Sequence, residues 1–65
     1  MDFKASQIWK SEKHEAVITI YEVANGEVSF KIEAEDFEQE TKWFVEVLKT
    51  FITDHGFELV NTLEK

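Results

Sequence analysis

Two runs of alternating apolar and polar residues, AVITIYEV and EVSFKIEA, lie on either side of Asn25-Gly26. Both runs are rich in β-branched and aromatic residues, which favour β-strands. The dipeptide Asn-Gly adopts the positive φ angles of a type I′ turn at little cost. The pattern therefore predicts a β-hairpin with a two-residue loop, in which Ala24 faces Glu27 and Val23 faces Val28.

The register of this hairpin decides which side chains share a face, because neighbours along a strand point to opposite sides of the sheet. Continued from the turn, the register makes three further pairs: Tyr21 with Phe30, Thr19 with Ile32, and Val17 with Ala34. The opposite face then holds a mixed set: Ala16, Ile18, Ile20, Glu22, Ser29, Lys31, Glu33 and Glu35. Ile18 and Ile20 are the apolar residues that this register places among polar neighbours.

After the hairpin, apolar residues recur at helical spacing. The stripe consists of Phe37, Phe44, Val47, Leu48, Phe51 and Ile52. Asp36 is a suitable N-cap, and Gly56 suits the left-handed residue that ends many helices. We therefore expect a helix from about residue 37 to residue 54.

The ends of the chain complete the predicted fold. FELVNTL alternates in part and predicts a final strand, whereas FKASQIWKS fits either a first strand or a short helix capped by Ser6. With the strand chosen, the order strand-strand-strand-helix-strand predicts a single α+β domain over residues 1–65. In this fold one long helix packs on one face of a small, mostly antiparallel sheet.

One helix covers only one face of a sheet, so the other face is solvated or covered by another chain. Ile18 and Ile20 are expected on that uncovered face. If a four-residue turn joins the first strand to the hairpin, Trp9 lies on the same face as Ile18 and Ile20. If the pairing of the first strand shifts by one residue, Ile8 lies there instead. Trp43, at the margin of the helical stripe, either seals the core or anchors an interface. Contiguous apolar surface usually marks a contact with another chain, and we expect a two-fold homodimer.

The stretch EAEDFEQE is dense in carboxylates. If a helix begins there, its dipole stabilises Asp36, Glu38 and Glu40 by roughly 0.3–1 kcal/mol each. The helix dipole does not explain the acidic residues that precede the expected helix, such as Glu33 and Glu35. The candidate acidic partner-binding residues are Glu22, Glu33, Glu35, Glu38 and Glu40. A site for a basic partner and plain solubility are both open interpretations.

Composition excludes several functions. The net charge is −7, from fourteen acids and seven bases, and every base is lysine. A negative field without arginine disfavours direct binding to nucleic acids or to anionic membranes. The chain has no cysteine, and hence no disulfide or thiolate metal site. It lacks a signal-peptide pattern and an apolar run of membrane-spanning length, so we expect a cytoplasmic protein.

Catalytic chemistry has little support in the sequence. His14 and His55 are the candidates that titrate near neutrality, and neither has a convincing set of partners. There is no nucleophile elbow and no glycine-rich phosphate loop, so we expect no enzyme, no cofactor and no metal site.

The resulting hypothesis is a small acidic interaction protein, a regulator or inhibitor of bacterial or phage origin. It would bind another protein through the apolar sheet face and its acidic rim. One alternative is a nucleic-acid mimic that blocks a DNA- or RNA-binding protein. Another is a structural subunit of a larger assembly.

Overall fold

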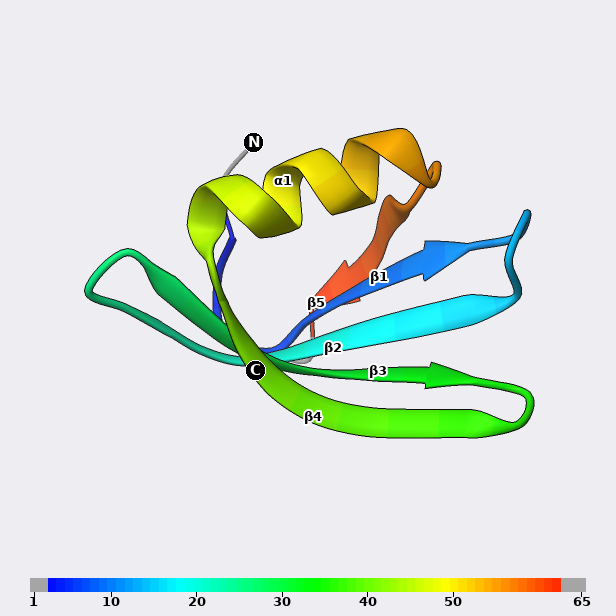
Figure 1. Ribbon diagram of the computed structural model, residues 1–65, viewed down its shortest axis with the longest axis horizontal. Coiled ribbons are helices and arrows are strands. Elements are labelled where there is room, and N and C mark those ends of the chain that lie inside the picture. The colour runs from blue at the N-terminus through cyan, green and yellow to red at the C-terminus, as the bar shows by residue number, and fades with distance from the viewer. Residues whose placement is uncertain (1–2, 63–65) are drawn as a thin grey trace.

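The computed structural model describes residues 3–62. Its elements in chain order are β1 (Gln7–Ser11), β2 (Ala16–Ala24), β3 (Glu27–Ala34), β4 (Phe37–Phe44), α1 (Val45–Asp54) and β5 (Glu58–Thr62). The five strands form one antiparallel sheet in the order β4-β3-β2-β1-β5. Figure 1 shows α1 lying over one face of this curved sheet. The predicted α+β class is confirmed, with one strand more than expected.

The β2–β3 turn has the predicted conformation. Asn25 and Gly26 have φ angles of 56° and 76°, as a type I′ turn requires. Ala24 lies opposite Glu27, and Val23 lies opposite Val28. The local sequence signal therefore specified this turn correctly.

Farther from the turn, the register shifts at a β-bulge. Glu22 lies opposite Ser29, but the next partner of Phe30 is Ile20, so Tyr21 is the extra residue. An extra residue moves all the side chains that follow it to the other face of the sheet. The bulge therefore turns Ile18 and Ile20 toward the face that carries α1.

The placement expected for Ile18 and Ile20 is consequently wrong. Their exposed fractions are 0% and 1%, and Trp9 is buried with them. The core lies between α1 and the sheet and contains Phe3, Trp9, Ala16, Ile18, Ile20, Val28, Phe30, Leu48, Ile52 and Phe57. Leu48 and Ile52 are the contribution of the helix.

The expected start of the helix is also wrong, because residues Phe37–Phe44 form β4. This strand pairs with β3 from Ala34 opposite Phe37 to Glu27 opposite Phe44. The sequence FEQETKWF supports strand as well as helix, and pairing with β3 satisfies the backbone groups on the side of β4 that faces β3. The helix begins at Val45 instead, and Asp36 lies in the β3–β4 turn, where it caps no helix.

The connection through α1 links the two edges of the sheet. β4 runs directly into α1, and after Gly56 the chain forms β5, which pairs with β1 (Figure 1). Gly56 has a φ of 69°, as expected for the residue that ends the helix. The final strand is confirmed for Glu58–Thr62, whereas Leu63 lies outside the described residues. Within residues 3–62, no helix has the length and apolar character needed to cross a bilayer.

Candidate protein-binding groove

A shallow apolar groove runs along α1 beside the edge strand β4. Its volume is about 530 Å³. β4 contributes Trp43 to the groove, and the helix and its C-terminal end contribute Glu46, Val47, Thr50, Phe51, Asp54 and His55. Because Leu48 and Ile52 face the core, residues next to them on the helix surface remain open to solvent. Val47 is 51% exposed.

The aromatic side chains of the groove are held by ring contacts. The Trp43 ring makes T-shaped contacts with Phe30 and Phe51, at centroid distances of 5.1 Å and 5.2 Å. Phe51 in turn stacks obliquely on His55 at 4.4 Å. Since Phe30 is fully buried, this row of rings extends from the core to the surface. The groove therefore has a preorganised aromatic floor.

Of the four apolar candidates from the sequence, Trp43 alone is only partly buried, and it lies in this groove. Ile18, Ile20 and Trp9 are core residues that a partner could reach only by opening the fold. Sequence reasoning placed Val47 in the core stripe and did not single out Asp54. With the helix beginning at Val45, the four-residue spacing of Val47 and Phe51 gives a lateral apolar row beside the buried stripe.

The two histidines have structural roles in this region. The Nδ1 atom of His55 donates a hydrogen bond of 2.9 Å to the carbonyl oxygen of Phe51. The Ser11 hydroxyl donates to the carbonyl oxygen of His55 at 2.8 Å and accepts from the His14 backbone N–H at 3.3 Å. Ser11 is fully buried, so it fastens the β1–β2 turn to the end of α1. In residues 3–62, no group of three or more His, Asp or Glu side chains is arranged for a metal ion.

The five acidic candidates do not surround the groove. By register with their buried neighbours, four lie on the sheet face away from α1: Glu22, Glu33, Glu38 and Glu40. Glu35 lies in the turn between β3 and β4. The structure therefore brings most of the acidic candidates to the outer face, in the company of lysines from β1, β3 and β4.

Lys31 neutralises part of this acidic face. Its Nζ atom lies 3.8 Å from Glu33 Oε1 and 3.6 Å from Glu38 Oε2. Glu33 and Glu38 are direct cross-strand partners, so the lysine bridges two carboxylates that would otherwise repel each other. The carboxylate of Glu33, then Tyr21 and Glu38, raise the pKa of Lys31 above its usual 10.5. This lysine is therefore fully charged at neutral pH.

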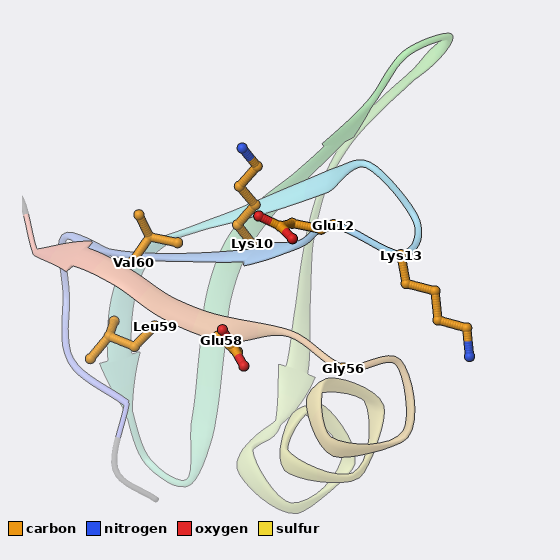
Figure 2. Close-up of a pocket in the computed structure, with 7 residues that line it drawn as sticks. All are labelled: Lys10, Glu12, Lys13, Gly56, Glu58, Leu59 and Val60. Atoms are coloured by element: carbon orange, nitrogen blue, oxygen red, sulfur yellow. The ribbon is translucent and has the colours of Figure 1, made fainter.

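A second hollow, of about 190 Å³, lies at the opposite edge of the sheet (Figure 2). It is lined by Lys10, Glu12, Lys13, Gly56, Glu58, Leu59 and Val60. In Figure 2 the Lys13 side chain points away from the hollow, and Leu59 and Val60 point to opposite sides of β5. These side chains do not converge on one point, so the larger groove is the better candidate.

No protein-family model, curated protein or solved structure matches the chain. The features of the molecule that bear on its function are accordingly the chemistry of the groove and the charge around it.

Proposed function

We propose that this protein is a non-enzymatic interaction module that binds a segment of another protein in the groove beside α1. The observation that supports the proposal is the solvent-accessible apolar row of Trp43, Val47 and Phe51. Contiguous apolar surface on a small protein is typical of contact sites. Aromatic rings that are already fixed lose little conformational freedom on binding. The groove replaces the Ile18 and Ile20 face as the proposed apolar contact.

The occupant that fits this groove is an amphipathic segment whose apolar side chains are flanked by lysine or arginine. Glu46 and Asp54 lie on the groove wall, about 12 Å apart along the helix. Glu46 shares its carboxylate with Lys49 at 3.6 Å, and Asp54 has no ion pair among residues 3–62. A net charge of −7 also attracts a basic segment from a distance. The negative charge on the groove wall therefore favours a partner segment that carries lysine or arginine.

A protein of this kind acts by occupying a surface, as a cytoplasmic regulator or inhibitor does. A nucleic-acid mimic would act through the acids on the outer face of the sheet. There, Lys31 forms ion pairs with Glu33 and Glu38, and Lys42 lies on the same face. Since mimicry needs unneutralised carboxylates along a surface, the groove supports protein binding better than the outer face supports mimicry.

The proposal is tested by titrating the ¹⁵N-labelled protein with a model amphipathic helix that carries leucines on one face and flanking lysines. Backbone shifts are expected at Trp43, Val47, Thr50, Phe51 and Asp54. The same peptide with glutamates in place of lysines should bind at least tenfold more weakly.

Val47→Glu should weaken binding of the lysine peptide at least tenfold, because it places a carboxylate in the apolar floor. Val60→Glu is the matched control, since Val60 is similarly exposed but lies at the other edge of the sheet. Shifts confined to the outer sheet face, and abolished by salt, would overturn the groove proposal in favour of an electrostatic surface.

A further inference from the structure

The outer edge of β4 is an unpaired strand edge over its whole described length. The backbone N–H of Val45 donates to the carbonyl oxygen of Gly26 at 2.9 Å, which points the odd-numbered residues of β4 toward β3. In an antiparallel ladder, successive residues direct their N–H and C=O groups to opposite sides. The backbone groups of Glu38, Glu40 and Lys42 therefore point outward, where a further strand can pair.

Natural edge strands are usually protected by a bulge, a proline or a short length. β4 has eight residues and no proline, and its pairing with β3 continues without a register shift. Its remaining protection is charge, from Glu38, Glu40 and Lys42 on the outer face. That charge pattern decides which strand is accepted.

We infer that β4 pairs with β4 of a second copy of this chain, antiparallel, about a two-fold axis that passes through Thr41. In this register Glu40 lies opposite Lys42 of the second copy, and the symmetry makes this pair twice. An axis one residue earlier places Glu40 opposite itself, and an axis one residue later places Lys42 opposite itself. Opposite charges across strands stabilise a pair and like charges destabilise it, so Glu40-Thr41-Lys42 favours this register over the two adjacent ones.

Both charges are free to make these contacts. The ion pairs within residues 3–62 join Lys31 to Glu33 and Glu38, and Lys49 to Glu46. Glu40 and Lys42 belong to none of them, and both are exposed. Lys31 lies directly opposite Glu40, but its ammonium group pairs with Glu33 and Glu38 instead. A second copy therefore supplies each of them with an ion-pair partner, which the described residues of its own chain do not.

The same register covers apolar surface. Phe37 and Phe44, at the two ends of β4, are 51% and 63% exposed. Phe37 is on the α1 side of the sheet, diagonally across from Trp43 of the second copy, within the roughly 7–8 Å that aromatic side chains span. The second copy's Phe37 thus extends the aromatic floor of the groove. This extension rests on the proposed function, whereas the strand pairing does not.

Sedimentation equilibrium of the wild-type chain at up to about 1 mM should show a dimer. Glu40→Lys alone places lysine opposite lysine, and Lys42→Glu alone places glutamate opposite glutamate. Each variant should therefore dimerise at least tenfold more weakly than the wild type. An equimolar mixture of the two variants restores opposite charges at both pairs and should form a heterodimer with near wild-type affinity.

Glu12→Lys and Lys13→Glu change the net charge by the same amounts in an exposed turn and should leave the dimer intact. Far-UV circular dichroism verifies that every variant is folded. A monomeric wild type, or single variants that dimerise as well as it does, would overturn the inference. A monomer that still binds the lysine peptide would leave the groove proposal standing.

Discussion

Ile20 lies directly opposite Phe30 in the β2–β3 pair, and both side chains are buried in the core. The residue after Ile20, Tyr21, is the extra residue of the bulge and is exposed. This one unpaired residue places Ile20 on the same face of the sheet as Val23, which regular alternation would not do. It also gives Ile18 a core position opposite Ile32.

Ile20→Ala should lower the free energy of unfolding by about 2–5 kcal/mol, because it leaves a cavity in a core that is small. A loss of this size is a large fraction of the stability of such a domain. Urea denaturation followed by circular dichroism measures it. The control is Tyr21→Ala at the exposed bulge, which should cost under about 1 kcal/mol. Equal losses in both variants would contradict the register described above.

Ser11→Ala should destabilise the fold by about 1–3 kcal/mol. The change removes a buried hydroxyl that donates to the His55 carbonyl oxygen and accepts from the His14 N–H, and it leaves both groups without that partner. Thermal and urea unfolding measure the loss. Ser29→Ala, on the outer face of β3, is the matched control and should change stability by less than about 0.5 kcal/mol.

Phe44→Asn should stabilise the fold by about 1 kcal/mol. Phe44 occupies the N-cap of α1 with extended backbone angles and makes no side-chain capping hydrogen bond, whereas asparagine accepts one from the first turn without adding a negative charge opposite Glu27. Phe44→Ala separates the loss of the ring from the gain of the cap.

Asp36→Ala should have little effect on urea unfolding, because Asp36 lies in the exposed β3–β4 turn.

The charge of Lys31 makes the free energy of unfolding depend on pH in the alkaline range. Its pKa in the folded state is above the usual 10.5, through Glu33 first and then Tyr21 and Glu38. A raised pKa contributes stability that is complete below the unfolded value and is lost as pH rises through the folded value. The stability difference between wild type and Lys31→Met should therefore shrink above a pH of about 10.5. Urea unfolding at several alkaline pH values measures this, and Tyr21→Phe isolates the contribution of the phenol.

The sequence carried a sign of the bulge that a strictly regular hairpin ignores. In β2 the buried apolar residues are Ala16, Ile18 and Ile20, with even numbers, whereas Val23, which lies on the same face near the turn, has an odd number. A change of parity within one strand is what an inserted residue produces. Asn25-Gly26 fixed the turn correctly because its signal is local. The register beyond Glu22 depends on packing against α1, which local sequence does not contain.

The helix boundary was ambiguous for a related reason. FEQETKWF carries apolar residues at both strand and helix spacing, and its pairing with β3 is decided by contacts outside the segment. The wrong register also affected the candidate site, because it placed Ile18, Ile20 and Trp9 on the uncovered face of the sheet. Trp43 is partly buried because it lies on the α1 side of the edge strand β4, opposite Val28, and not at the margin of a helical stripe as the sequence pattern indicated.

The path of the chain from β4 over α1 to β5 has a consequence for biosynthesis. Gln7–Ser11 is synthesised before Glu58–Thr62, yet the two strands pair in the sheet. Until Glu58–Thr62 has been made, one side of β1 has no strand to pair with. Closure of this edge therefore cannot precede the synthesis of β5, and a strand edge that waits unpaired is prone to aggregation.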